Sequence, residues 1–364
     1  MIKPLRLAMV GVGDVAQRDY LPELGRISGH ATLAAVVGRT PTRAIEVGRS
    51  HGVPWFTDVD DMFSSIDIDC ILNLTPIPTH YEVSLSALQA GKHVYSEKPI
   101  TTSLEEAHHL RQLARDKGLV IVPAPSVMLF PQIAEAKRLI HEGAVGEVTG
   151  ARSVMSAGPP PWDGYMSDPS PYFAEGAGPL VDIGVYGLHA ITGLLGPAQR
   201  VIALSSKTRT SFVVEEGPAA GTVVAVDEDD QWTTCLRIGA GVLASVEADF
   251  TSVGGSAPEL EIMGTDRAIE VSLLDGASPL HLTDSKGERS QITISGARRG
   301  GGPDHLLGVE HLVRCVIENR QPDVSIEHAI HCLEILHASR ESATTGRAVD
   351  LDPGAWPRPQ EENQ

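Results

Sequence analysis

Hydrophobic and polar residues follow different patterns in the two halves of the chain. In the first half, short apolar runs alternate with segments of helical periodicity, as in strands that alternate with helices. The apolar runs lie at residues 5–10, 32–37, 67–74, 93–96 and 119–122. Alternating strands and helices predict a parallel sheet covered by helices. We therefore expect an α/β domain over residues 1–123.

The second half carries the two-residue period of half-buried strands. The alternating segments are 200–206, 221–226, 231–238, 241–250, 259–264, 268–273 and 291–295. They predict a large, mostly antiparallel sheet that is open on one face, with helices at 131–142, 179–195, 304–319 and 326–344. The second α/β domain is expected over residues 124–352, followed by a flexible tail at 353–364.

Composition narrows the possible partners and the compartment. The chain of 364 residues is long enough for two domains, and its 42% hydrophobic residues can form substantial cores. The formal charge of −18 argues against nucleic acid or an anionic membrane, since both attract clustered lysine and arginine. Four cysteines without paired or metal-ligand spacing predict reduced thiols, a cytoplasmic protein and no metal. The sequence shows no signal peptide and no apolar run long enough to span a membrane.

A glycine-rich turn directly follows the first predicted strand. Gly11 and Gly13 precede Ala16 in the pattern Gly-x-Gly-x-x-Ala, and helical periodicity begins at Asp14 and Val15. The first glycine permits a tight turn, the second lets a pyrophosphate approach the backbone, and the alanine allows close helix–strand packing. The N–H groups at the start of the helix attract phosphate. These residues therefore predict a dinucleotide-binding site.

The end of the second strand indicates which dinucleotide is bound. An NAD site usually carries a carboxylate there, which accepts hydrogen bonds from the ribose hydroxyls. This chain instead has Arg39 and Thr40, with Arg43 one helical turn later. Guanidinium and hydroxyl groups suit a 2′-phosphate, so NADP is preferred over NAD. The alternative is that both arginines are solvated and Thr40 is only the N-cap of a helix.

Two further strand ends carry polar groups that would lie at the same sheet edge. Thr75 and Pro76 follow one strand, with His80 in the first turn of the next helix. Glu97 and Lys98 end another strand, and the proline after Lys98 keeps that lysine extended. Open α/β sheets bind ligands at this edge, which predicts cofactor contacts for all five residues. The alternatives are an exposed, idle histidine and a solvated Glu–Lys pair in a turn.

These motifs together resemble those of the Gfo/Idh/MocA oxidoreductases. The resemblance rests on Gly11-x-Gly13-x-x-Ala16, on Thr75-Pro76 with His80, and on Ala90-Gly91-Lys92-His93-Val94 followed by Glu97-Lys98-Pro99. It extends with varying strength from residue 5 to about residue 350. It implies an N-terminal Rossmann domain that binds NAD(P). It also implies a C-terminal α/β domain whose open sheet forms a homodimer or homotetramer.

The helix predicted at 179–195 carries an unusual set of polar residues. Asp182, Tyr186 and His189 are spaced to share one helix face, and burying them without a task would be costly. Gly184 and Gly187 weaken this helix and suggest that its backbone closely approaches another part of the molecule. The alternative is a hydrogen-bonded cluster with a purely structural role. The segment resembles the family's catalytic helix, Asp-x-Gly-x-(His or Tyr), in its tyrosine form.

A long loop rich in proline and glycine precedes this helix, at residues 156–178. Loops of this length are usually functional or disordered. Trp162, Tyr165 and Tyr172 could form a stacking wall for a sugar-like ring, with Trp162 as the main substrate contact. They could equally anchor the loop by packing on one another.

The expected reaction is hydride transfer between NADP and a carbinol or carbonyl carbon of a sugar, cyclitol or related polyol. Lys98, as an ammonium, would hydrogen-bond the reacting oxygen. Tyr186 would be the acid or base, Asp182 would orient Lys98 or the substrate, and His189 would bind a hydroxyl or relay protons. Two alternatives on the same fold are an NAD-dependent glycoside hydrolase and a non-catalytic, ligand-sensing regulator.

Overall fold

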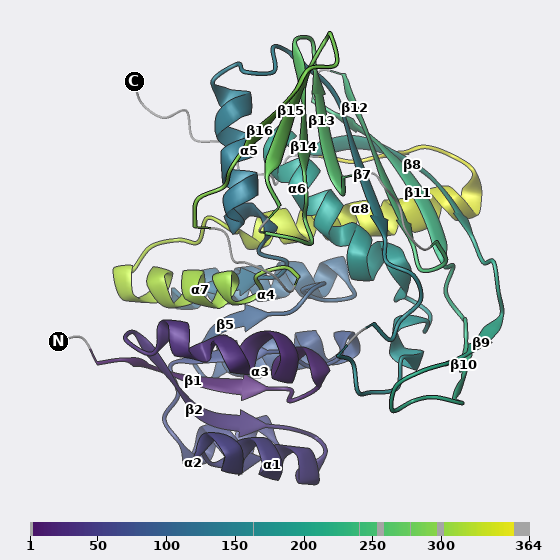
Figure 1. The fold of residues 1–364 in the computed structure, drawn as a ribbon. Coiled ribbons are helices and arrows are strands. Elements are labelled where there is room, and N and C mark those ends of the chain that lie inside the picture. The colour runs from purple at the N-terminus through teal and green to yellow at the C-terminus, as the bar shows by residue number, and fades with distance from the viewer. Residues whose placement is uncertain are drawn as a thin grey trace. The chain divides into compact units, whose positions relative to one another are not determined.

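The computed structural model describes residues 3–162, 164–239, 241–252, 258–276, 278–296 and 302–352. The tail predicted at 353–364 lies outside these residues. The chain forms two compact units. The first comprises Met1–Ser126 and His305–Ile330, and the second comprises Val127–Asp304 and His331–Gln364. Figure 1 colours the chain by residue number, so the returning segment of the first unit is recognised by its yellow-green helix.

The first unit contains a six-stranded sheet in the order β3-β2-β1-β4-β5-β6. Every neighbouring pair in it is parallel, which confirms the predicted doubly wound α/β architecture. The strands are β1 (Leu5–Val10), β2 (Ala31–Val37), β3 (Trp55–Phe56), β4 (Cys70–Asn73), β5 (His93–Ser96) and β6 (Ile121–Pro123). The helices between them are α1 (Pro41–His51), α2 (Val59–Ser65), α3 (His80–Gln89) and α4 (Leu104–Lys117). The carboxyl ends of β1, β4 and β5 are therefore neighbours at one sheet edge.

The connection from β1 to β2 is helical but irregular. Its first part, η1 (Ala16–Tyr20), is a π-helix, and its second part, η2 (Leu21–Ile27), is a 3₁₀-helix. A π-turn takes in one more residue than an α-turn and is often found at functional sites. It turns Tyr20 into the protein, where the side chain has no exposed surface.

A helix from the end of the chain completes the first unit. Helix α7 (Leu306–Glu318) packs against β5 and β6. Gly308 makes this packing possible, because a Cβ atom there would lie 2.5 Å from the Tyr95 ring. The division expected from the sequence placed residues 305–330 in the second domain, and amphipathic periodicity does not identify the sheet that a helix covers.

The second unit contains a nine-stranded sheet in the order β16-β15-β14-β13-β7-β12-β11-β8-β17. Only β7 and β12 pair in parallel, and the other neighbouring strands of this sheet are antiparallel, as predicted. The strands are β7 (Val148–Ser156), β8 (Ala198–Ser206), β11 (Gln231–Ile238), β12 (Val242–Asp249), β13 (Leu260–Gly264), β14 (Arg267–Val271), β15 (Leu280–Asp284), β16 (Arg289–Ile292) and β17 (Val349–Asp350).

Two details differ from the sequence prediction. The segment predicted at 221–226 contains β10 (Val223–Ala225), which pairs with β9 (Ser211–Val213) in a separate two-stranded sheet. Strands β3, β9, β15 and β17 were not predicted. A short alternating segment indicates a strand but does not specify its partner.

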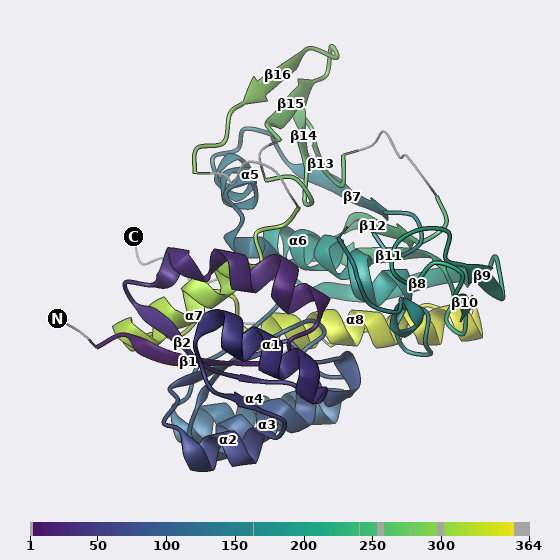
Figure 2. The same cartoon turned by 60° about the horizontal axis from the view of Figure 1, so that its bottom comes forward.

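One face of the large sheet is covered by helices and the other is open. Helix α6 (Val185–Leu195) packs on β7 and β12, and α5 (Pro131–His141) packs on β14. Residues of α8 (Ile326–Thr345) beyond residue 330 reach β8 and β11, where the Ser342 hydroxyl accepts a hydrogen bond from the Ala203 N–H. Figure 2 shows α6 and α8 on the same side of these strands. Large apolar side chains remain exposed on the other face, among them Leu204 (72%) and Leu243 (66%).

Among the described residues, none of the helices combines the length and apolar character required to cross a membrane.

Candidate cofactor and catalytic site

The glycine-rich turn is sterically restricted at its first glycine and open at its second. Gly11 has a φ of 95°, and a Cβ atom there would lie 2.4 Å from the Leu74 carbonyl oxygen. A Cβ atom on Gly13 would meet nothing within 4 Å. Asp14 and Val15 follow as the first helical residues, and Ala16 is completely buried. The turn therefore requires glycine at residue 11 for the fold, whereas at residue 13 the backbone faces open space.

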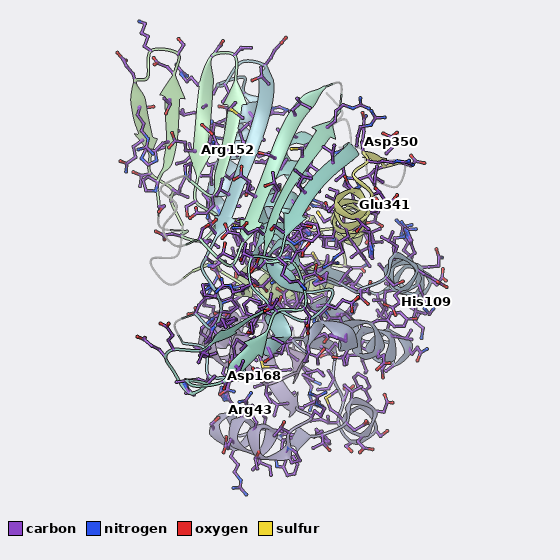
Figure 3. The ribbon with its side chains drawn as sticks, turned by 90° about the vertical axis from the view of Figure 1, so that its right-hand side faces the viewer. Arg43, His109, Arg152, Asp168, Glu341 and Asp350 are labelled. Atoms are coloured by element: carbon purple, nitrogen blue, oxygen red, sulfur yellow. The ribbon has the colours of Figure 1, made fainter. Side chains whose placement is uncertain are left out.

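The end of β2 carries accessible cationic and hydroxyl groups. Arg39 and Thr40 are exposed, and Arg43 on the first turn of α1 is half-buried (Figure 3). Thr40 is the N-cap residue of α1, but its side chain makes no capping hydrogen bond. Neither arginine forms an ion pair with any residue that the structure describes. These donors are therefore available to a ligand.

Asn73 organises the turn that follows β4, and the sequence analysis did not identify it. Its side chain is fully buried, and its Nδ2 donates to the His80 carbonyl oxygen (2.9 Å) and to Ser84 Oγ (3.0 Å). Its Oδ1 accepts a hydrogen bond of 2.6 Å from Thr75 Oγ1. Pro76 then precedes a short 3₁₀-helix, Ile77–Thr79. An asparagine at the end of an apolar strand was the available signal, since burying an amide is costly unless it is bonded.

His80 is a buried bridge between two loops, so the alternative of an exposed, idle histidine is wrong. Its Nδ1 lies 2.7 Å from the Pro99 carbonyl oxygen, and its Nε2 lies 2.8 Å from the Thr75 carbonyl oxygen. Burial lowers the pKa of His80 despite these two hydrogen bonds. The ring thereby links the loop after β4 to the loop after β5. The Lys98–Pro99 peptide bond in the second loop is cis.

Glu97 is also buried, so the alternative of a solvated Glu–Lys pair is wrong for this residue. The Tyr20 hydroxyl donates to Glu97 Oε1 (2.5 Å), and the Lys98 N–H donates to Glu97 Oε2 (3.0 Å). Burial alone would raise the pKa of Glu97. The charges of His305 and Lys98 and the hydrogen bond from Tyr20 reverse this, and the pKa lies below its usual range. Glu97 is therefore an anion at neutral pH, with Lys98 half-buried beside it.

The polar helix of the second unit begins at Leu180, and its first turn is π-helical rather than α-helical. Leu180–Gly184 is the π-turn, and Val185–Leu195 continues as α6. Asp182 is half-buried in the π-turn, whereas Tyr186 and His189 are buried in α6. Burial, together with His331, lowers the pKa of His189 to about 3, so its imidazole is neutral near neutral pH.

The two glycines of this helix bring it close to the sheet, as predicted. A Cβ atom on Gly187 would lie 2.3 Å from Ser153 Oγ, and one on Gly184 would lie 2.9 Å from the Ala248 Cβ. The residues at 184 and 187 must therefore lack a side chain for the helix to lie against β7 and β12. The segment that carries Asp182 and Tyr186 is consequently fixed by main-chain packing.

Trp162 packs within its own loop, which favours the anchor interpretation. Its ring makes edge contacts with Tyr165, Tyr172 and Phe250 at centroid distances of 5.5 to 5.6 Å. Its Nε1 donates to the Ala157 carbonyl oxygen (2.8 Å). Further along the loop, the Asp168 carboxylate accepts hydrogen bonds from the N–H and hydroxyl of Ser170 (Figure 3). The loop is thus held by aromatic and polar contacts, among its own residues and with Phe250 outside it.

The predicted site residues fall into two groups. The first unit holds the predicted cofactor contacts and Lys98, at the ends of β1, β2, β4 and β5. The second unit holds Asp182, Tyr186, His189 and Trp162.

The whole chain resembles curated enzymes of known activity. It is 24% identical to scyllo-inositol 2-dehydrogenase (NAD(+)) of Bacillus subtilis over 355 residues, which cover 96% of each protein. It is also 24% identical to D-xylose 1-dehydrogenase (NADP(+)) 2 of Haloferax volcanii, over 96% of this chain and 100% of that enzyme. Among solved structures, aldose-aldose oxidoreductase from Caulobacter crescentus, complexed with glycerol, superposes with a TM-score of 0.80. That match covers 96% of this chain and 100% of the other at 21% identity, so it concerns the fold.

Two family matches cover most of the chain. Residues 5–124 match the oxidoreductase family GFO/IDH/MocA with its NAD-binding Rossmann fold, and residues 133–270 match the GFO/IDH/MocA C-terminal domain. The parallel sheet and the large mixed sheet described above correspond to these two domains. The chain therefore belongs to the GFO/IDH/MocA family and is an NAD(P)-dependent oxidoreductase.

Proposed function

We propose that the protein transfers a hydride between NADP and a carbinol or carbonyl carbon of a sugar, cyclitol or related polyol. The observation that carries this proposal is the fixation of Lys98 at the carboxyl end of β5, at the same sheet edge as the glycine-rich turn. Its relatives named above act on scyllo-inositol and D-xylose, which are polyhydroxylated rings. Family membership together with this lysine supports a dehydrogenase or reductase.

In the proposed mechanism, protein groups handle the proton while the cofactor handles the hydride. Bound NADP supplies the nicotinamide that accepts or donates the hydride. Lys98 donates a hydrogen bond to the reacting oxygen and stabilises negative charge on it. Tyr186 removes a proton from the alcohol, or returns one to the carbonyl, as the hydride moves. Asp182 orients the substrate or Lys98.

The proposed cofactor contacts follow the edge of the parallel sheet. The backbone of Gly11, Gly13, Asp14 and Val15 would contact the pyrophosphate. Thr75, Pro76, His80, Glu97 and Lys98 would shape the nicotinamide side, with His80 and Glu97 acting through the loops that they hold. In the second unit, neutral His189 would bind a substrate hydroxyl, and Trp162 would support the substrate loop from within its aromatic cluster.

The cofactor preference rests on Arg39, Thr40 and Arg43. We expect Arg39→Ala and Arg43→Ala each to raise the Kd for NADP by about 10- to 100-fold, the effect of losing a hydrogen bond to a charged group. The Kd for NAD should change little. Arg49→Ala, in the last turn of α1, is the matched control. Fluorescence titration measures both constants, and wild-type protein that binds NAD as tightly as NADP would end this part of the proposal.

The catalytic assignment is tested with a panel of sugars and cyclitols, monitored by the absorbance of the reduced nicotinamide in both directions. Lys98→Met and Tyr186→Phe should each lower kcat by orders of magnitude while leaving the Kd for NADP close to wild type. Lys117→Met and Tyr81→Phe are controls, because they remove an exposed ammonium and a surface hydroxyl. Wild-type turnover in either site variant would refute the assignment.

The same panel separates the two alternative functions. A glycoside hydrolase of this fold would release sugar with no net change in nicotinamide absorbance. A ligand-sensing regulator would bind a sugar without turnover.

The open face of the large sheet is the proposed interface of a homodimer or homotetramer. Leu204 and Leu243 expose apolar surface there, and Cys235 lies between them, paired in register with Ile202 and Ser245. Cys235 is the exposed one of the four free cysteines, whose reduced state suits the cytoplasm.

Chemical modification and light scattering test this interface. Maleimide should modify Cys235 slowly where light scattering reports an oligomer, and faster on dilution. Leu204→Glu should give monomers, whereas Val223→Glu on β10, which is also exposed (67%), should not. Oligomers that persist in Leu204→Glu with unchanged Cys235 reactivity would contradict the interface.

A further inference from the structure

Tyr20 lies at the centre of a buried polar network in the first unit. Its hydroxyl donates to Glu97 Oε1 and lies 2.8 Å from the Tyr95 hydroxyl. A phenol has one proton to donate, so Tyr95 must donate to Tyr20. Both rings have no exposed surface, and their centroids are 5.8 Å apart. The order of donation is therefore Tyr95 to Tyr20 to Glu97.

The irregular helix after β1 is what brings Tyr20 into this network. Tyr20 is the last residue of the π-turn Ala16–Tyr20, which follows the glycine-rich turn directly. The Gln17 amide further fastens this turn, because its Nε2 donates to the Val12 carbonyl oxygen (2.9 Å). The segment predicted to bind the cofactor thus also contributes a side chain at the carboxyl end of β5.

Glu97 transmits the contact to the main chain of Lys98. One carboxylate oxygen accepts from the Tyr20 hydroxyl, and the other accepts from the Lys98 N–H. His305, at the start of the returning segment, lies beside Tyr20 with a ring-centroid distance of 5.9 Å. The carboxylate is therefore fixed at both oxygens, and the lysine backbone is fixed by the carboxylate.

We propose that Tyr20 is a positioning residue, whose hydroxyl fixes the Glu97 carboxylate so that it holds the main chain of Lys98 in the orientation needed for turnover. This inference rests on the proposed function, in which Lys98 contacts the reacting oxygen. It assigns the π-turn after the dinucleotide motif a second task besides connecting β1 to β2.

The proposal predicts a specific dependence on pH. The charged or titratable groups around Glu97 are Tyr20, Lys98, His305, Tyr95 and His80. The hydrogen bond from Tyr20 favours the ionised carboxylate, so its loss raises the pKa of Glu97. Glu97 then takes up a proton at a higher pH as the solution is acidified. The acid limb of the kcat profile should therefore move to higher pH in Tyr20→Phe.

The test compares Tyr20→Phe with Glu97→Gln and with two tyrosine controls. Tyr81→Phe removes a surface hydroxyl that contacts His109, whose position on the outer surface is labelled in Figure 3. Tyr95→Phe removes a buried hydroxyl of the same network but leaves the bond from Tyr20 to Glu97 in place. A loss of stability alone should therefore affect Tyr95→Phe as well as Tyr20→Phe.

Two measurements report on the network. Hydrogen–deuterium exchange of a peptide spanning Glu97–Ile100 follows the Lys98 amide without requiring turnover, and this amide should exchange faster in Tyr20→Phe and Glu97→Gln. The kcat of Tyr20→Phe should fall by about 10- to 100-fold, with an unchanged Kd for NADP, as expected for losing one hydrogen bond to a buried charge. The acid limb of the kcat profile of Tyr20→Phe should move to higher pH, whereas Tyr81→Phe and Tyr95→Phe should keep the wild-type acid limb.

The outcomes separate this inference from the proposed function. Suppose that Lys98→Met abolishes turnover, whereas Tyr20→Phe equals Tyr81→Phe in the exchange rate of the Lys98 amide, in kcat and in the acid limb of the kcat profile. The role of Tyr20 is then refuted and the proposed function stands. If Tyr20→Phe merely loses stability as Tyr95→Phe does, with an unmoved acid limb, the positioning role is also refuted. If Lys98→Met turns over like wild type, the proposed function itself fails.

Discussion

Replacing Gly187 with alanine would place a methyl group into the contact between the large sheet and the helix that carries Asp182 and Tyr186. The new Cβ atom would lie 2.3 Å from Ser153 Oγ and 2.7 Å from the Ser153 Cβ. Rotation of the Ser153 hydroxyl could relieve only the first contact, and it would break the hydrogen bond of 2.7 Å to the Glu259 carbonyl oxygen. The second contact involves an atom fixed to the backbone of β7. Separating it from 2.7 Å to the 3.4 Å of ordinary contact requires a shift of about 0.7 Å.

Such a shift would move Tyr186, the neighbour of Gly187, by a comparable amount. A misplacement of about 1 Å can cost on the order of 100-fold in rate, so we expect kcat to fall by about 10- to 100-fold. The stability effect should be smaller, because an overpacking cost of about 1–3 kcal/mol is offset by about 1 kcal/mol of gained helix propensity. If the loss in kcat, expressed as a free energy, exceeds the loss in the free energy of unfolding, displacement of the helix is the cause of the lower kcat.

The assay measures kcat at saturating substrate and unfolding by urea for Gly187→Ala, Ser153→Gly and the double variant. Ser153→Gly removes both clashing atoms, so the double variant should recover most of the kcat lost in Gly187→Ala. Gly25→Ala is the control, because a Cβ atom there meets nothing within 4 Å. Wild-type kcat in Gly187→Ala, or no recovery in the double variant, would refute the reasoning.

Three other changes test separate parts of the structure. Gly11→Ala should lower Tm, because its Cβ atom would meet the Leu74 carbonyl oxygen. Gly13→Ala should keep the wild-type Tm and raise the Kd for NADP, because its Cβ atom meets nothing within 4 Å. Equal Tm values for the two variants would contradict this difference. Asn73→Ala should destabilise the first unit by about 1–3 kcal/mol in urea, since it leaves buried hydrogen-bonding groups without their partner. His189→Asn should flatten the pH dependence of unfolding. Because burial and a neighbouring histidine lower its pKa from 6.5 to about 3, the unfolded chain binds a proton between these values that the folded chain does not. The contribution of His189 to stability should therefore decrease by about 1.4 kcal/mol per pH unit on acidification through that window, and an identical slope in wild type and His189→Asn would refute this assignment.

The sequence predicted the parallel sheet and the large mixed sheet because both depend on periodicity, which is a local property. It also predicted that the ends of β1, β4 and β5 lie at one edge, since the carboxyl ends of parallel strands must share an edge. The close approach of Gly184 and Gly187 followed from their cost in a helix. In each case one short segment contained the whole signal.

Most features that the sequence did not reveal depend on contacts between distant segments. Tyr20 and Glu97 are 77 residues apart, and no local pattern pairs a tyrosine with a carboxylate. Helix α7 has an ordinary amphipathic pattern, which gives no sign that it returns to the first sheet. The π-turns Ala16–Tyr20 and Leu180–Gly184 have no periodic signature in the sequence. A single extra residue in a helical turn looks like ordinary variation in the spacing of apolar residues.

The two groups of site residues are fixed by the same physical means, although they lie in different units. Lys98 is held through its main chain, by the Glu97 carboxylate on one side and by the link from His80 to Pro99 on the other. Tyr186 is held by a helix whose glycine at residue 187 packs directly on the Ser153 side chain of β7. Main-chain fixation of this kind does not depend on which sugar is bound. Selectivity among substrates should therefore reside in segments such as the loop around Trp162, whose aromatic contacts involve neither Lys98 nor Tyr186.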